Sequence, residues 1–254
     1  MKQKTLIVGY GIVGQNLSKE LKNLNPDIYD KYNIEVNTKQ NIKYDITFIC
    51  VDTPLTQDNN LDIKEVKNAI NDNDSEIYVI KSTCPLGTVE KLKKQTKKRI
   101  IFSPEYYGST QHCNNYNFDF TILGGDKQDC IEVIQTLQHC YDARHTFRIT
   151  DSKTAELVKF MENSFLATKV SFCNQFYNIC KNNNIHYEEL RELFILDKRL
   201  GESHTFVYRD KPYWDSHCLN KDVNYIAHQE KAKLLQEVCN FNNKQKKDFT
   251  NKEN

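Results

Sequence analysis

The chain has 254 residues, with 35 Lys and Arg against 34 Asp and Glu, which gives a formal net charge of +1 at pH 7. This length accommodates one large or two modest domains, each able to bury a core. Because the charge is so close to zero, neither nucleic acid nor an anionic membrane is expected as a partner. No apolar run approaches the roughly 20 residues that a membrane-spanning helix requires.

The nine cysteines are scattered along the chain, and none forms a C-x-x-C pair. The spacing of a zinc site is therefore missing, and no metal site is predicted. An odd number of cysteines without a recognisable signal peptide is typical of a reducing compartment, so we expect a cytoplasmic protein.

The first 150 residues alternate short apolar runs with amphipathic stretches. Strands are expected at 5–8, 28–32, 46–51, 77–80, 100–102 and 120–123, and helices at 12–24, 63–70, 88–95 and 128–137. Strands that alternate with helices predict an α/β domain with a doubly wound parallel sheet.

The alternation of short apolar runs with amphipathic stretches ends near residue 150. Residues 151–181 contain neither Gly nor Pro and carry apolar residues at helical spacing, which predicts one helix about 45 Å long. Further helices are expected at 186–196 and 221–240, and residues 241–254 are predicted to be a disordered tail. Residues 151–240 would thus form an all-helical domain. Its long helix suits the seam of a homodimer, since two-fold dimers are the commonest oligomers.

Residues 9–14 fit the pattern G-x-G-x-x-G between a predicted strand and a predicted helix. The first glycine allows a tight turn, the second lets a pyrophosphate approach the backbone, and the third lets helix and strand pack closely. The start of the helix offers free N–H groups and a positive dipole end to phosphates. The residues predicted to contact the cofactor here are Gly9, Gly11, Ile12, Val13 and Gly14.

Asp30 lies about 20 residues further on, at the end of the second predicted strand. A carboxylate at this place bonds the ribose hydroxyls and repels a 2′-phosphate, so the predicted cofactor is NAD and not NADP. Lys31 follows directly and weakens that preference. The alternative interpretation is a tight turn that binds nothing.

Three other places carry polar residues suited to chemistry. The segments 81–88 and 103–107 follow predicted strands at the sheet edge where α/β proteins place ligands, although Pro and Gly there also fit ordinary turns. Lys159 and Asn163 share a helix face and line either a polar cleft or a solvated stripe. Cys218 has Lys221 nearby at a predicted helix start, which favours a thiolate, although most lone cysteines are buried and inert.

Together these segments resemble the UDP-glucose/GDP-mannose dehydrogenase family over roughly residues 4–230. Six motifs follow the glycine motif in the family's order: V-x-T-P at 51–54, S-T-x-P-x-G-T at 82–88, P-E-Y at 104–106, E-x-x-K-x-x-x-N-x-F-L-A at 156–167, D-x-R-x-G at 197–201 and C-x-x-K-D at 218–222.

The resemblance implies two successive NAD-dependent oxidations of one sugar carbon, from alcohol to acid, as in the conversion of UDP-glucose to UDP-glucuronate. Cys218 would be the nucleophile that passes through a thiohemiacetal and a thioester. Glu105 would act in acid–base steps, and Lys159 with Asn163 would stabilise the oxyanion. Asp222 and Thr83 would hold the water that hydrolyses the thioester. Glu105, Lys159, Asn163 and Arg199 would also contact the nucleotide-sugar substrate, and Thr53, Thr83 and Lys221 the cofactor.

The chain departs from the family's pattern just before Cys218. The family has a glycine-rich loop there, whereas this chain reads Tyr-Trp-Asp-Ser-His at 213–217. Trp214 and Asp215 would either fill part of the sugar pocket or re-aim Cys218. His217 would either assist a thiolate or be an ordinary loop residue.

The chain is also shorter than the family, which continues into a third domain that supplies much of the nucleotide-diphosphate site. The sequence is therefore expected to end after the second domain, so that a partner chain completes the site or the substrate is smaller. Three functions stay open: a nucleotide-sugar dehydrogenase, a module that binds NAD or a nucleotide sugar without turnover, and a hydroxyacid or small-alcohol dehydrogenase. The last would use Lys159 without covalent catalysis.

Overall fold

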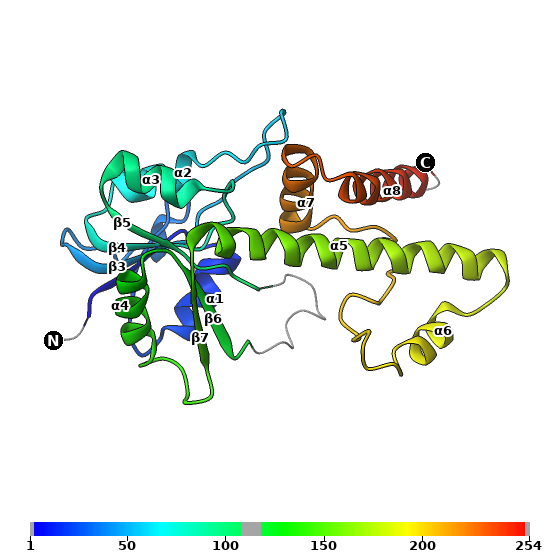
Figure 1. Ribbon diagram of the computed structural model, residues 1–254, viewed down its shortest axis with the longest axis horizontal. Helices are drawn as coiled ribbons and strands as arrows, with labels where there is room; N and C mark the ends of the chain where they lie inside the picture. Colours follow the sequence, from blue (N-terminus) through cyan, green and yellow to red (C-terminus); the bar gives the residue numbers. More distant parts are fainter. Residues whose placement is uncertain (1–2, 108–117, 252–254) are drawn as a thin grey trace. The chain divides into compact units, whose positions relative to one another are not determined.

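A computed structural model describes residues 3–107 and 118–251. It divides the chain into two compact units: Met1–Thr56 with Asn60–Lys159, and Gln57–Asn59 with Phe160–Asn254 (Figure 1). The sequence placed a boundary near residue 150, whereas this division falls within the long helix. The helix begins in the first unit because its first turns pack there: Ala155 is fully buried in that unit's core.

The first unit is built on a seven-stranded sheet with the order β2-β1-β3-β4-β5-β6-β7. The strands are β1 Thr5–Val8, β2 Asp27–Tyr29, β3 Tyr44–Ile49, β4 Ser75–Ile80, β5 Arg99–Phe102, β6 Phe120–Gly124 and β7 Thr146–Thr150. The predicted doubly wound sheet is confirmed, with one addition: β6 joins β5 antiparallel and pairs with β7 in parallel. The sequence did not predict β7, which lies at the sheet edge with Arg148 and Ile149 exposed.

The helices of the first unit lie on both faces of the sheet (Figure 1). They are α1 Ile12–Glu20, α2 Lys64–Asn71, α3 Thr88–Thr96 and α4 Lys127–Leu137, with a short 3-10 turn, η1, at Ile34–Val36. Helix α1 ends four residues before its predicted end at 24, and a turn follows. Leu21 and Leu24 are nevertheless buried, because the turn keeps them against the sheet and so preserves their apolar spacing.

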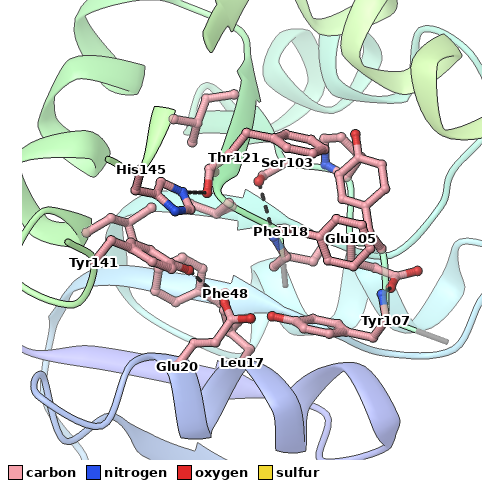
Figure 2. A pocket seen from close by; sticks show the side chains of 17 residues that line it. Leu17, Glu20, Phe48, Ser103, Glu105, Tyr107, Phe118, Thr121, Tyr141 and His145 are labelled. Atoms are coloured by element: carbon pink, nitrogen blue, oxygen red, sulfur yellow. Dashed lines mark hydrogen bonds between the residues drawn. The ribbon is translucent and has the colours of Figure 1, made fainter. Parts of the chain in front are cut away.

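Side chains that point to one face of the sheet pack under α1 and α4. Ile7, Phe48, Val79 and Ile101 belong to this core, together with residues of the two helices. A pocket opens on this side and is lined by residues that include Glu20, Lys81, Glu105, Tyr141 and His145. Within it Tyr141 donates a hydrogen bond to Glu20 (2.7 Å), and Thr121 Oγ1 lies 2.8 Å from His145 Nε2 (Figure 2).

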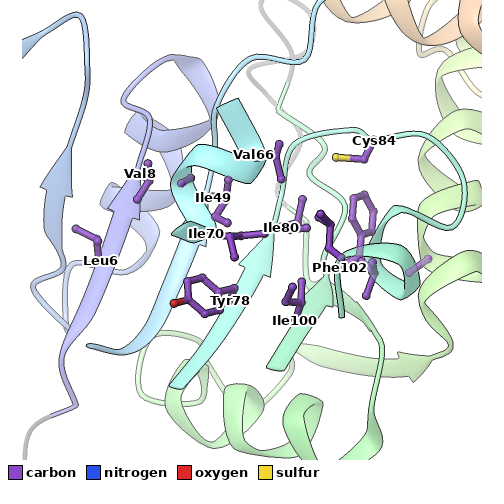
Figure 3. Packing of buried hydrophobic residues seen from close by; sticks show 14 of the residues in the cluster. Leu6, Val8, Ile49, Val66, Ile70, Tyr78, Ile80, Cys84, Ile100 and Phe102 are labelled. Carbon is purple, nitrogen blue, oxygen red and sulfur yellow. The ribbon is translucent and has the colours of Figure 1, made fainter. Parts of the chain in front are cut away.

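Alternate residues of the same strands form the second core, under α2 and α3. Leu6, Ile49, Tyr78, Ile80 and Phe102 are all buried there (Figure 3). Both faces of the central strands are therefore buried, which is why these segments read as continuous apolar runs in the sequence.

The second unit is helical. It contains most of α5 Ser152–Asn182, then α6 Tyr187–Phe194, α7 His217–Gln229 and α8 Lys233–Thr250. The predicted long helix agrees with α5 to within one residue at each end. Among the described residues, no helix is long and apolar enough to cross a membrane.

Two predictions for the end of the chain were wrong. A single helix at 221–240 was expected, but α7 and α8 are separated at Lys231, which has a φ of 53° although the sequence offers no Gly or Pro there. The break allows Val238 and Cys239 of α8 to share a core with Val223 of α7. The predicted tail is helical as far as Thr250, because this packing continues into it; residues 252–254 lie outside the described part.

Candidate active site

The glycine loop lies at the carboxyl end of β1, where the strand order reverses between β1 and β3. Gly9 has a φ of +93°, and a Cβ added there would come within 2.5 Å of the Cys50 carbonyl oxygen. A Cβ on Gly14 would come within 2.0 Å of the Gly9 oxygen, whereas one on Gly11 would meet nothing within 4 Å. Gly9 and Gly14 thus permit the turn and the helix contact, and Gly11 leaves open space at the start of α1.

This arrangement fits a dinucleotide. Gly11 is the N-cap of α1 and provides no side-chain cap, so the first N–H groups of the helix face open space where a pyrophosphate would bind. Ile12, the first residue of α1, is 54% exposed, and Val13 is partly buried. The glycine loop therefore leaves room for a phosphate at the start of α1, and the contacts of its residues with the cofactor stay a prediction.

Asp30 ends the β2 region and is tied to the backbone of the glycine loop. It accepts hydrogen bonds from Tyr10 N (2.7 Å) and from the backbone N–H groups of Tyr32 and Asn33 (2.8 Å each). Partial burial would raise the pKa of Asp30, but the three backbone donors outweigh it and leave the pKa below 3.8. The carboxylate is thus ionised and held beside the glycine loop, and its contact with the ribose stays a prediction.

Two other predicted cofactor residues are engaged within the first unit. Lys31 forms an exposed ion pair with Glu65 (3.3 Å), which raises the pKa of Lys31. The buried Thr53 hydroxyl donates to the carbonyl oxygen of Thr83 (2.7 Å), so the loops after β3 and β4 are bonded to each other.

The segment after β5 brings a carboxylate and an amine together. Lys159 Nζ lies 3.5 Å from Glu105 Oε1, and both side chains are about nineteen-twentieths buried, at 5% and 6% exposure. The other Glu105 oxygen accepts from Tyr107 N (2.9 Å), and Lys159 lies over the ring of Tyr106. Buried Lys81 reaches the same strand end from β4 and donates to Ser103 (3.2 Å); burial lowers the pKa of Lys81. The Glu105 carboxylate and the Lys159 amine therefore form a buried pair at the carboxyl edge of the sheet.

Glu156, one turn before Lys159, fixes the start of α5. Its carboxylate is fully buried and accepts hydrogen bonds from Gly87 N (2.6 Å) and Val89 N (3.0 Å) at the start of α3. Burial raises the pKa of Glu156, against the two backbone donors. This contact holds the end of the 82–88 motif to the helix that carries Lys159.

In the second unit three predicted site residues form one buried chain. Asn163 Nδ2 donates to Asp222 Oδ2 (2.6 Å), and Lys221 Nζ donates to Asp222 Oδ1 (2.7 Å). Asp222 is 1% exposed, so its charge is compensated by these partners in a site with little water. The structure thus joins two motifs that are 59 residues apart in the sequence.

Cys218 lies in the first turn of α7, which Ser216 caps by accepting from Leu219 N (3.2 Å). Cys218 is partly buried. Because Cys218 and Asp222 are four residues apart on one helix, they lie on the same face. The nucleophile predicted from the sequence therefore stands one turn from the buried carboxylate.

The residues that replace the glycine loop do not all lie as the sequence suggested. Trp214 does not fill a sugar pocket: it is 5% exposed and belongs to the core formed with Ala167, Val223 and Ala227. Its indole N–H donates to Ser171 (2.9 Å), because a buried indole needs an acceptor. His217 is exposed at the start of α7.

Arg199 is at the surface, in the segment after α6. Its side chain is 87% exposed, and its guanidinium pairs with Asp197 of the same motif (2.6 Å). The structure therefore does not bring Arg199 into the buried chain around Asp222. In the described ranges, no group of three or more His, Cys, Asp or Glu could hold a metal ion.

The sheet topology and the glycine loop define a dinucleotide-binding α/β protein with a helical second unit. Its sequence matches the NAD-binding domain of the UDP-glucose/GDP-mannose dehydrogenase family over residues 6–142 and the family's central domain over residues 153–244. The chain belongs to the UDP-glucose/GDP-mannose dehydrogenase family, whose members use NAD.

Known relatives agree with this assignment. The chain is 28% identical to UDP-glucose 6-dehydrogenase TuaD of Bacillus subtilis over 80% of its own length and 47% of the relative. It is 26% identical to UDP-N-acetyl-D-mannosamine dehydrogenase of Methanocaldococcus jannaschii, over 88% and 54%. The chain thus spans about half the length of these relatives.

A solved UDP-glucose dehydrogenase from Pyrobaculum islandicum superposes with a TM-score of 0.78 at 20% identity, covering 96% of this chain and 68% of that one. At this identity the likeness concerns the fold.

Sequence reasoning missed the residues of α8 that contact the loop before Cys218. Asn242 and Lys246 belong to a Lys- and Asn-rich stretch that resembles a solvated tail. The signal was nevertheless present, since Leu235, Val238 and Cys239 continue an apolar helical spacing into that stretch.

Proposed function

We propose that this chain is an NAD-dependent nucleotide-sugar 6-dehydrogenase that oxidises a sugar alcohol to the acid in two steps, as in the conversion of UDP-glucose to UDP-glucuronate. The observation that carries the proposal is the buried chain Asn163–Asp222–Lys221 with Cys218 on the same face of α7. A one-step alcohol oxidation has no need of this cysteine, whereas a covalent route to the acid requires a nucleophile at that point.

In the first oxidation, the sugar C6 alcohol loses a hydride and a proton and becomes an aldehyde. Gly9, Gly11 and Asp30 would hold NAD, which would supply the hydride acceptor. The Lys159 ammonium and the Asn163 amide stabilise the oxygen by charge and by hydrogen bonding as negative charge develops on it. The buried Lys159–Glu105 pair supports this role, because little water competes there.

In the second oxidation, the Cys218 thiolate adds to the aldehyde carbon to form a thiohemiacetal. Loss of a second hydride leaves a thioester, and water then cleaves its C–S bond to give the acid and free Cys218. Glu105 takes and returns the protons, while Thr83 and Asp222 orient the water. Overall, one alcohol and one water yield one acid with the reduction of two NAD. Lys221 and Thr53 would assist in holding the cofactor, and Arg199 would contact substrate.

The proposal is tested by following NADH formation to completion with limiting nucleotide sugar: UDP-glucose, UDP-N-acetyl sugars and GDP-mannose. Two NADH per sugar support the two-step reaction. One NADH per sugar indicates a single-step dehydrogenase that relies on Lys159. No NADH from any of these sugars, in a sample whose NAD binding is confirmed by calorimetry, contradicts the proposal and favours a binding module.

We further propose that the protein forms a homodimer through α5. The residues that support this are apolar, lie along one side of the helix and are exposed by between 38% and 74%: Met161, Phe165, Phe172, Phe176 and Ile179. Burying such a stripe against a second copy removes apolar surface from water. Light scattering is expected to give the mass of a dimer and, for a Phe165→Glu/Phe172→Glu variant, of a monomer; a wild-type monomer contradicts the proposal.

A further inference from the structure

The segment that leads into Cys218 is tied to the far end of the chain. The backbone N–H of Trp214 donates to Asn242 Oδ1 (2.9 Å), and Asn242 Nδ2 donates to the Trp214 carbonyl oxygen (2.9 Å). The amide therefore pairs with both polar groups of one residue's backbone, as a neighbouring strand would. Asn242 is 3% exposed, so neither bond is exchanged readily for water.

Neighbouring contacts fix the same segment from other directions. Asp215 accepts from Lys246 of α8 (3.0 Å) and from Asn220 of α7 (2.7 Å). The ring of Tyr213 packs edge-on against Phe249 of α8 at a centroid distance of 6.0 Å. Three consecutive residues before the α7 cap thus contact α8.

This attachment decides where α7 begins. Ser216, which caps α7, directly follows the attached residues, and Cys218 is two residues further on. A glycine-rich loop would not by itself fix the residue at which α7 begins, because glycine leaves many backbone conformations open. In this chain the contacts with α8 hold the loop in one conformation, and the first turn of α7 follows directly from it.

We propose that Asn242 is a positioning residue for Cys218: by bonding both backbone groups of Trp214, it fixes the loop that sets the place of the thiol relative to Asp222. The inference rests on the proposed function insofar as Cys218 is the nucleophile. If Asn242 served only to pack α8, an apolar side chain would suit the buried site better, because an amide is costly to bury without partners.

The chain contains its own reporter, because Trp214 is the only tryptophan. Asn242→Ala is compared with Asn243→Ala, which removes the same type of side chain from the adjacent, exposed position of α8. In Asn242→Ala we expect Trp214 emission to move to longer wavelength and acrylamide quenching to increase, whereas Asn243→Ala keeps the wild-type spectrum. An unchanged spectrum in Asn242→Ala overturns the inference.

Two further readouts separate positioning from a merely structural role, at a temperature where circular dichroism shows both variants folded. Peptide-resolved alkylation of Cys218 at neutral pH is expected to be several-fold faster in Asn242→Ala than in the wild type, because a released loop leaves this partly buried residue more accessible, whereas Asn243→Ala keeps the wild-type rate. The kcat for acid formation should fall by about 10-fold to 100-fold, while the Kd for NAD is unchanged. A lower melting temperature with an unchanged alkylation rate and kcat contradicts positioning.

The two proposals can fail separately. If the wild type makes no NADH, the fluorescence and alkylation measurements still decide whether Asn242 fixes the Cys218 loop. If Asn242→Ala does not fold, Lys246→Gln tests the same attachment from its half-exposed side, since it removes the ion pair with Asp215 and the cation's contact with the Tyr213 ring but leaves the Asn242 bonds in place. We then expect a smaller increase in the alkylation rate of Cys218, and an unchanged rate overturns the inference.

Discussion

The sheet unit and the helical unit hold their functional groups in different ways. In the sheet unit the glycine loop is shaped by backbone contacts, and the Asp30 carboxylate accepts from three backbone N–H groups. In the helical unit Asn163, Lys221 and Asp222 hold one another by side-chain bonds. The two functions should therefore respond to different substitutions. Cofactor binding should be sensitive to side chains added in the glycine loop of the sheet unit, whereas covalent chemistry should be sensitive to the loss of a hydrogen-bonding side chain in the helical unit.

The largest effect is expected from the helical unit's nucleophile. Cys218→Ala should lower acid formation by about 10³-fold or more, because no other group forms the thioester. The Kd for NAD should stay within about twofold, since the glycine loop belongs to the other unit. Initial rates and isothermal titration measure the two quantities, and Cys140→Ala, at a partly buried cysteine of the sheet unit, is the control. Full acid production by Cys218→Ala would contradict the covalent mechanism.

The next effect concerns the partners of Asp222. Asp222→Ala leaves the buried Lys221 ammonium without its carboxylate, and the free energy of unfolding should fall by about 3 kcal/mol. Urea unfolding measures this loss, and Asp210→Ala, at an exposed acid of the same unit, should change it little. Adding Lys221→Met to Asp222→Ala should restore much of the lost free energy of unfolding. A loss that is the same with and without Lys221→Met would mean that the pair is not coupled.

Added bulk in the glycine loop should separate folding from binding. Gly14→Ala forces its Cβ against the Gly9 carbonyl oxygen and should lower the free energy of unfolding by about 2 kcal/mol. Gly11→Ala meets no protein atom, so stability should hold while NAD binds about tenfold more weakly or worse. Thermal unfolding and calorimetry on the two variants check this. Normal NAD affinity in Gly11→Ala would contradict the position given to the pyrophosphate.

The smallest effect belongs to Asp30. Backbone donors lower its pKa below 3.8, so its stabilisation is present above pH 3.8 and is lost as the pH falls through the native pKa. Asp30→Asn should therefore cost about 1 kcal/mol at pH 7, and the difference from wild type should shrink below pH 3.8. Urea unfolding at a series of pH values measures this, with exposed Asp74→Asn as the control. A difference that does not vary with pH would show that charge plays no part.

The sequence predicted most of the sheet unit because its signals are local. Apolar runs gave the central strands, and the glycine spacing gave the turn and the start of α1. The edge strand β7 was missed although its polar and apolar residues alternate as in a half-buried strand, because five residues contain only two apolar positions and form too short a run to stand out. In the helical unit α5 was predicted almost to the residue, since 31 residues without Gly or Pro leave few alternatives.

What the sequence alone determined was the dinucleotide-binding fold and the long helix, because these follow from short-range patterns. The ordered motifs also named candidate catalytic residues, whose roles stay predictions. Only the tertiary structure decided that Asn163 bonds Asp222, that Trp214 fills the helical core, and that Asn242 holds the loop before Cys218. The two hydrogen bonds join residues 59 and 28 positions apart, and a break at Lys231 with no turn signal brings α8 back onto α7. Such pairings depend on which distant surfaces pack together, which no local pattern specifies.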